Sequence, residues 1–363
     1  MISNRPRLAF AIFAAAFLLS GCGGPPPASG WSSPIVSNQV VYFGSVDGRV
    51  MAVIASDGAL KWAFPDPTVA AFGPIYATPA IANGTIYIGT SEHKLYALDV
   101  ATGAKKWEFT ALAPIFSGAT IQNRIVYFGA NDHKVYALDA TNGAKKWDFA
   151  TSGEVWADIA VESGVVYVAS LDHKLYALDA VTGSKKWDFD AGGLIVTKPL
   201  IANGIIYFAG LNKFFALGVS DGAKKWDFSA DNWVWSNPTI ANGVVYFGTL
   251  GGSVYALDAS NGSAKWPAPF VTGNSVRSAI IVDRDTAYFG SEDFKLYALD
   301  IATTKEKWPP YLAGGKIIST PAVADGLIYV TSYDYILQAI NASDGKVKWK
   351  LNTHERKLAN TVN

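Results

Sequence analysis

Short apolar runs with partial alternation recur along residues 31–351, and each is bounded by pairs such as Asn-Gly, Thr-Gly or Asp-Gly. Typical runs are "TIYIG" (85–89) and "KLYALD" (94–99), which are rich in β-branched and aromatic residues. Such runs predict β-strands joined by tight turns, because Asn-Gly and Asp-Gly tolerate the positive φ that hairpin turns require. No stretch after residue 30 shows the spacing of an amphipathic helix, so we expect an all-β protein.

The predicted strands belong to one repeat of about forty residues that occurs eight times along the chain. Each copy ends in a Lys-Trp pair, and successive tryptophans are 39 to 45 residues apart. The tryptophans are Trp62, Trp107, Trp147, Trp187, Trp226, Trp266, Trp308 and Trp349. A strand-rich run in each copy contains Tyr42, Tyr87, Tyr127, Tyr167, Tyr207, Tyr246, Tyr288 or Tyr329. The "KLYALD" run always carries an alanine: Ala52, Ala97, Ala137, Ala177, Ala216, Ala256, Ala298 and Ala339.

Four strands in each copy is the signature of a propeller blade. We therefore expect residues 31–363 to form one eight-bladed β-propeller of four-stranded antiparallel blades. The constant alanine would let neighbouring sheets pack closely, and the eight Lys-Trp tryptophans are predicted to be structural side chains that wedge between blades. No spare strand is evident to join the last blade to the first, and the tail after residue 350 is polar.

The repeated unit resembles a known family. "YALDATNGAKKWDF" (136–149) and its copies are similar to the pyrroloquinoline-quinone (PQQ) repeat of eight-bladed quinoprotein-type propellers. One branch of that superfamily contains PQQ-dependent alcohol and glucose dehydrogenases. Another contains BamB, the non-catalytic lipoprotein of the outer-membrane β-barrel assembly machine. The repeat implies the architecture and does not by itself imply a bound quinone.

A dehydrogenase is not expected. The alcohol dehydrogenases of the family sandwich PQQ between a tryptophan and a disulfide of adjacent cysteines, whereas this chain has one cysteine, Cys22. They also carry long insertions that build the catalytic and calcium sites, and this chain keeps close to its period throughout. We find no phosphate-binding loop and no nucleophile elbow, so we predict no catalytic residue and no cofactor, with PQQ as the one cofactor to test.

The first 30 residues have the pattern of a bacterial lipoprotein leader. Arg5 and Arg7 precede an apolar run from Leu8 to Leu19, and "LSGC" (19–22) resembles a lipobox. We expect residues 1–21 to be a signal peptide, Cys22 to be lipidated, and residues 22–30 to include a Pro/Gly-rich tether. Gly23 replaces the aspartate that retains related lipoproteins in the inner membrane, which favours the periplasmic face of the outer membrane.

Charge and histidine content argue against two other functions. The formal net charge is zero, so nucleic acid is not an expected partner. His93, His133 and His173 occupy the same column of three consecutive copies. Equivalent turns on neighbouring blades are about 10 Å apart, which is too far for ligands of one zinc ion. We therefore predict no metal site, and we interpret the nearby Asp47, Asp132 and Asp172 as turn residues.

The copies differ most just before their first strands, which should line the central channel. One column there contains Trp31, Trp156 and Trp235, and otherwise Tyr76, Phe116, Val196, Val276 and Ile318. Two positions later the column reads Ser33, Thr78, Gly118, Asp158, Lys198, Asn237, Ser278 and Thr320. These departures define a candidate binding patch of Trp31, Trp156, Trp233, Trp235, Asp158, Lys198 and Arg277.

Three interpretations of this patch remain open. The aromatic rings could fill the wall of the funnel while Asp158 and Lys198 form an ion pair across neighbouring blades. Exposed tryptophan and arginine could instead dock a protein, and "ADNWVW" (230–235) is the strongest single candidate. A planar ligand could also stack on the rings. The resulting hypothesis is a lipid-anchored scaffold of the cell envelope, BamB-like, with a periplasmic binder of PQQ or another small ligand as the alternative.

Overall fold

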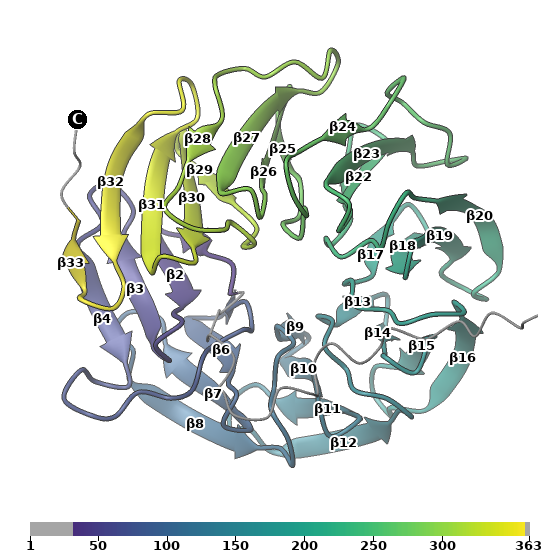
Figure 1. Ribbon diagram of the computed structural model, residues 1–363. Coiled ribbons are helices and arrows are strands. Elements are labelled where there is room, and N and C mark those ends of the chain that lie inside the picture. Colours follow the sequence, from purple (N-terminus) through teal and green to yellow (C-terminus); the bar gives the residue numbers. More distant parts are fainter. Residues whose placement is uncertain (1–31, 360–363) are drawn as a thin grey trace, which may run out of the picture.

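The computed structural model describes residues 32–359, which form eight antiparallel sheets arranged in a ring (Figure 1). Each sheet is one blade, and its strands lie in chain order from the axis outward. The described residues contain strands, turns and bends and no helix, so none is long and apolar enough to span a membrane. The predicted architecture, an eight-bladed β-propeller of antiparallel blades, is confirmed.

The first four blades contain, in chain order, β1 (Ile35–Ser37), β2 (Val40–Gly44), β3 (Val50–Ile54), β4 (Leu60–Phe64); β5 (Ala80–Ala82), β6 (Thr85–Gly89), β7 (Lys94–Asp99), β8 (Lys105–Thr110); β9 (Thr120–Gln122), β10 (Ile125–Ala130), β11 (Lys134–Asp139), β12 (Lys145–Ala150); and β13 (Ala160–Glu162), β14 (Val165–Ala169), β15 (Lys174–Asp179), β16 (Lys185–Asp190).

The last four blades contain β17 (Leu200–Ala202), β18 (Ile205–Gly210), β19 (Lys213–Gly218), β20 (Lys224–Ser229); β21 (Thr239–Ala241), β22 (Val244–Gly248), β23 (Ser253–Asp258), β24 (Phe270–Val271); β25 (Ile281–Asp283), β26 (Thr286–Gly290), β27 (Lys295–Asp300), β28 (Tyr311–Leu312); and β29 (Ala322–Ala324), β30 (Leu327–Ser332), β31 (Ile336–Asn341), β32 (Val347–Asn352), β33 (Lys357–Leu358).

The recurring tyrosine, alanine and tryptophan lie in one row across each blade. In blade 3, Tyr127 is opposite Ala137 in the β10–β11 register, and Ala137 is opposite Trp147 in the β11–β12 register. A bulge follows this row at Ala137/Leu138. The alanine is fully buried, and the ring centroids of Tyr127 and Trp147 are 5.8 Å apart. The absence of a larger side chain at the alanine allows the two rings to approach each other over it.

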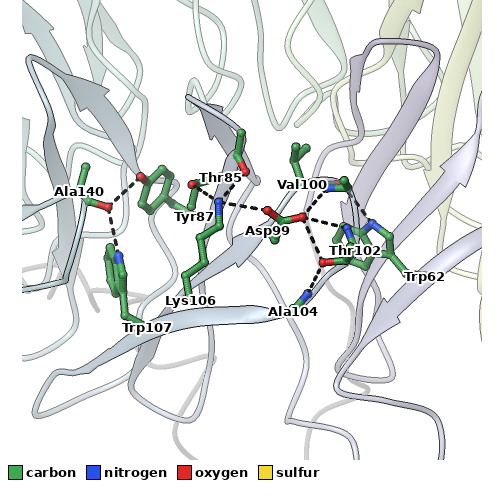
Figure 2. A network of polar contacts seen from close by, with 12 residues as sticks. Trp62, Thr85, Tyr87, Asp99, Val100, Thr102, Ala104, Lys106, Trp107 and Ala140 are labelled. Atoms are coloured by element: carbon green, nitrogen blue, oxygen red, sulfur yellow. Dashed lines mark hydrogen bonds and ion pairs between the residues drawn. The ribbon is translucent and has the colours of Figure 1, made fainter.

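The same row makes the contact between blades. Trp107 Nε1 and the Tyr87 hydroxyl of blade 2 both donate to the carbonyl oxygen of Ala140 in blade 3, each at 3.1 Å (Figure 2). The indole also covers Gly143, where an added Cβ would lie 2.7 Å from Trp107 Cε3. Seven of the eight tryptophans donate to a carbonyl of the next blade: Trp62, Trp107, Trp147, Trp226, Trp266, Trp308 and Trp349. Trp187 covers Gly222 in the same way.

Within residues 32–359, the ring closes through this contact and not through a shared strand. Trp349 Nε1 and the Tyr329 hydroxyl of blade 8 donate to the Ala55 carbonyl of blade 1, at 3.0 and 3.1 Å. The C-terminal tail does add a strand, β33, but it pairs with β32 of its own blade. Blade 8 is therefore five-stranded, and the 8–1 junction resembles the other seven.

The two faces of the ring differ in their connections. One face, here called the loop face, carries the turns between second and third strands and the loops that lead from each fourth strand to the next first strand. Backbone hydrogen bonds join these two kinds of connection, as from Ala111 N to His93 O at 2.8 Å. The opposite face carries the remaining turns, including the "DAVTGSKK" turn between β15 and β16.

Candidate functional site

The residues that precede the first strands form an aromatic arc on the loop face. Tyr76 and Phe116 meet edge to face at 4.9 Å between centroids, and Phe116 and Trp156 do so at 6.4 Å. All three side chains are half-buried. Trp31, which the sequence places in the same column, lies outside the described residues. The arc therefore runs over blades 2 to 4, with Val196 interrupting it in blade 5.

Trp156 is fixed by a carboxylate of its own loop. Its Nε1 donates to Glu154 Oε2 at 2.5 Å, and Asn131 Nδ2 of blade 3 donates to the same oxygen at 3.2 Å. The Asn131 Oδ1 atom is buried and has no hydrogen-bond partner among the residues that the structure describes. Glu154 therefore orients the indole and ties the second-to-third-strand turn of blade 3 to the loop that enters blade 4.

Trp235 of blade 6 lies beneath a cation from blade 7. The guanidinium carbon of Arg277 is 4.6 Å from the Trp235 ring centroid, a distance typical of cation–π contacts. The column assignment from the sequence is wrong at this blade, because Val276 is fully buried and packs on Gly248, as Ile75 packs on Gly44. Arg277 therefore takes the position that Trp156 and Trp235 hold in their own blades.

Glu292 joins this pair to blade 8. Arg277 Nε donates to Glu292 Oε1 at 2.5 Å, and Lys316 Nζ donates to Oε2 at 2.7 Å. The Glu292 side chain is only 10% exposed. Its burial acts to raise the pKa of Glu292, but the hydrogen bonds from Lys316 and Arg277 outweigh burial and hold the pKa below the ordinary value of 4.5. The carboxylate therefore stays ionised and links the entrances of blades 7 and 8.

Asp158 does not form an ion pair with Lys198, as one interpretation of the sequence proposed. Asp158 Oδ1 instead accepts the backbone N–H of Gly118 in blade 3 at 2.5 Å, and so faces away from blade 5. Lys198 N likewise donates to Asn237 Oδ1 of blade 6 at 2.7 Å. Side chains of this column thus hold the preceding blade, which directs Asp158 away from Lys198.

In blade 7 the same column position belongs to Ala279 and not to Ser278, because the Ala279 N–H donates to Thr320 Oγ1 of blade 8.

Trp233 is the most exposed tryptophan in the described part of the chain. It is 41% exposed, whereas its neighbour Val234 is buried and Trp235 is half-buried. The Trp233 backbone is held in place, because its carbonyl oxygen accepts from Leu250 N at 2.8 Å. The "ADNWVW" stretch thus presents one indole to solvent from a fixed backbone and packs the other beneath Arg277.

Side chains of the inner strands line an open cavity of about 480 Å³ in blades 3 to 6. Its described lining includes one lysine, Lys198, one carboxylate, Glu162, and no aromatic ring. PQQ is a planar quinone with several carboxylates, so its binding calls for a stacking surface and several cations. A lining with no net charge and no ring does not fit PQQ, and both cations at the mouth, Arg277 and Lys316, are bound to Glu292.

The three column histidines lie in turns. His93, His133 and His173 have φ of 65°, 64° and 75°, and other blades place Gly48 and Gly252 at equivalent turn positions. Asp132 and Asp172 act as turn residues that also hold the incoming loops, because they accept from Leu112 N and Ser152 N. Within residues 32–359, no three His, Cys, Asp or Glu side chains are close enough to share a metal ion.

Sequence reasoning missed three residues of this site: Glu154, Glu292 and Lys316. When the repeat copies are aligned, Glu292 occupies the position of Asn131 and Leu171. A charged residue at that position departs from the other copies, as Trp235 does in its own column. Alignment of the copies on the turn before the third strand would have revealed it. The mouth patch, as the term is used below, consists of Glu154, Trp156, Trp233, Trp235, Arg277, Glu292 and Lys316.

Comparison with solved structures shows the fold of this chain in proteins of differing activity. BamB from Moraxella catarrhalis has a TM-score of 0.70 and 20% identity, with 83% of this chain and 93% of that chain covered. A europium-containing methanol dehydrogenase has a TM-score of 0.69 and 15% identity, over 84% and 82% of the two chains. The quinohemoprotein alcohol dehydrogenase from Comamonas testosteroni has a TM-score of 0.66 and 15% identity, over 88% and 73%.

At these identities the neighbours share the fold alone. No curated protein matches the chain by sequence. A family model does: that of the outer membrane protein assembly factor BamB matches residues 25–114, 46–157, 131–210, 191–315 and 273–363. These overlapping matches extend over all eight blades. The chain therefore belongs to the PQQ-repeat propeller family described by the outer membrane protein assembly factor BamB.

Proposed function

We propose that this protein is a non-catalytic, lipid-anchored scaffold of the bacterial cell envelope that acts in the assembly of outer-membrane β-barrel proteins. The observation that carries the proposal is the match of the BamB family model across residues 25–363. The leader supports an envelope location at the periplasmic face of the outer membrane, because Cys22 follows a lipobox-like sequence. The shared fold with dehydrogenases does not decide between a scaffold and an enzyme.

The proposed absence of catalysis is supported by the number of cysteines and by the residues that line the cavity. The chain has one cysteine, so it cannot form the disulfide that the related alcohol dehydrogenases place on PQQ. The cavity between blades 3 and 6 has the wrong charge and no stacking ring for this cofactor. We propose that the protein carries no PQQ.

The docking surface in this proposal is the mouth patch. It combines an exposed indole at Trp233 with an arginine on Trp235 and with ionised groups that are already paired, Glu292 with Lys316. Interfaces concentrate their binding energy in tryptophan and arginine, and prepaired charges lose little conformational freedom on binding. The partner that fits is a protein of the envelope, namely a subunit of the β-barrel assembly machine.

The proposal is tested by in-cell photocrosslinking of the full, affinity-tagged chain. A crosslinking residue replaces Trp233 in one strain and Val181 in the other. Val181 is 76% exposed and lies in the β15–β16 turn of the opposite face, so it is a matched control. We expect β-barrel assembly subunits to be captured through position 233 and not through 181. Efficient recovery of the tagged protein with none of these subunits would overturn the assembly role.

A further inference from the structure

A second group of exposed apolar side chains lies on the loop face, farther from the axis than the mouth patch. It consists of Val271 in blade 6, Phe294 and Leu312 in blade 7, and Tyr335 in blade 8. Their exposed fractions are 62%, 42%, 64% and 41%. We call this group the apolar rim. Single exposed apolar residues are common, but four of them on three consecutive blades are typical of an interaction surface.

The fold does not require apolar residues at these positions. Phe294 and Tyr335 have the left-handed turn conformation that His93, His133 and His173 adopt in blades 2 to 4. Leu312 is opposite Lys295, and Val271 opposite Ser253, at the ends of their fourth strands. The equivalent strand ends in blades 2, 4 and 5 carry the polar residues Thr110, Asp190 and Ser229, and that of blade 3 carries the small Ala150. Val69 and Leu112, in the loops after β4 and β8, are also exposed apolar residues of the loop face, so such side chains are most frequent in blades 6 to 8 but are not confined to them.

The chain enters the propeller beside this rim. Ser32, the first described residue, accepts the Gly44 N–H on its Oγ at 2.8 Å, at the loop-face end of β2. Gly44 and Tyr335 both line a small cavity between blades 8 and 1. The ten residues from Cys22 to Trp31 can span at most about 35 Å when extended. A lipid on Cys22 would thus keep the blade 8–1 junction within that distance of the membrane.

From the rim and the tether together we propose that the apolar rim rests on the lipid surface, with the propeller tilted so that blades 7 and 8 are nearest the membrane. Aromatic and aliphatic side chains of this kind are suited to the interfacial region of a bilayer. Without Arg5 and Arg7 of the leader, the lipidated chain has 28 basic and 30 acidic side chains, a formal net charge of −2, which gives no attraction to anionic lipid. The tilt leaves the part of the mouth patch in blades 4 to 6, namely Glu154, Trp156, Trp233 and Trp235, farthest from the membrane. The inference rests on the lipid anchor of the proposed function.

The test uses the lipidated full chain in vesicles of phosphatidylethanolamine and phosphatidylglycerol. Because Cys22 is the only cysteine, single variants Phe294→Cys and Leu312→Cys can each carry an environment-sensitive fluorophore. Val181→Cys, on the opposite face and 76% exposed, is the control. Spin-labelled lipids then report which fluorophore contacts the bilayer. Two rim variants are used so that one poorly folding variant does not decide the result.

We expect spin-labelled lipid to remove most of the emission at positions 294 and 312 and little at 181. Equal quenching at all three positions would overturn the inference. Fluorophores at 294 and 312 that are shielded from water yet unquenched by lipid would also overturn it, and would indicate a protein surface on the rim. Flotation of the unlabelled chain with the vesicles separates the two proposals: a chain that does not float lacks the anchor, whereas one that floats without quenching has another orientation.

Discussion

Trp349 donates its indole N–H to the carbonyl oxygen of Ala55 over 3.0 Å, although the two residues are 294 positions apart in the chain. The Tyr329 hydroxyl donates to the same oxygen. Trp107 and Tyr87 make this double contact with Ala140 in the interior of the chain. The junction between the last and first blades is therefore built like a junction between consecutive blades.

This equivalence predicts that Trp349→Ala and Trp147→Ala are similarly destabilising. Both indoles are more than nine-tenths buried, and removing so large a side chain typically lowers the free energy of unfolding by about 3–5 kcal/mol. Chemical denaturation of the two variants measures the difference. A much smaller loss for Trp349→Ala would mean that the closing junction contributes little to stability.

Gly143→Ala should be more destabilising than Gly164→Ala. Both glycines have positive φ, 75° and 77°, so each substitution places alanine in a region that costs roughly 1–2 kcal/mol. Only at Gly143 would the new Cβ also meet Trp107, whereas Gly164 has nothing within 4 Å. Thermal unfolding of both variants isolates this steric contribution. Equal losses would show that the indole can move aside freely.

Glu292→Gln should reduce stability at neutral pH and have less effect in acid. Since the folded pKa of Glu292 lies below 4.5, its ion pairs stabilise the native state above that pH and are lost as the pH falls through the lowered pKa. We expect the wild type to exceed the variant by about 1–2 kcal/mol at pH 7, with the two converging in acid. Denaturation curves at several pH values check this, and a constant difference would exclude a titrating role.

Trp233→Ala should separate binding from stability. Because the indole is 41% exposed, its removal is expected to change the free energy of unfolding by about 0.5 kcal/mol or less. In cells, affinity capture with a chemical crosslinker should nevertheless recover less β-barrel assembly machine from this variant than from Val181→Ala. Equal recovery from both variants would remove Trp233 from the docking surface.

Titration with PQQ should produce no saturable quenching of tryptophan fluorescence. The cavity offers Lys198 as its only cation among the described lining residues, offset by Glu162. Saturable quenching that disappears in Lys198→Ala or Trp235→Ala would contradict this expectation. Dye reduction with added PQQ, calcium and simple alcohols provides the second measurement, and activity above a heat-inactivated control would establish a dehydrogenase.

The repeat made the fold predictable, since residues such as Tyr127, Ala137 and Trp147 recur because they form one row across a blade. The mode of closure was not predictable, because the sequence does not say which carbonyl an indole will reach. The polar tail also gave no indication that β33 would pair within blade 8.

The candidate site was predicted less well. Trp235 and Arg277 do lie together, but the distances along the sequence placed Val276 in the wrong column by one residue. Asp158 and Lys198 have opposite charges on adjacent blades, yet the Asp158 carboxylate accepts a hydrogen bond from the Gly118 backbone N–H instead of pairing with Lys198. Competition between backbone and side-chain partners of this kind cannot be read from residue types alone.

Closure through Trp349 and Ala55, without a shared strand, has a consequence for how such a chain is built. Among residues 32–359, no blade combines strands from the two ends of the chain, so the order in which blades occur along the chain is not fixed by the ring. A circular permutant with new termini between any two blades, and with the original ends joined, should still fold into the same eight-bladed ring. Growth of the propeller by duplication of single blades would likewise have required no additional closing strand at any step.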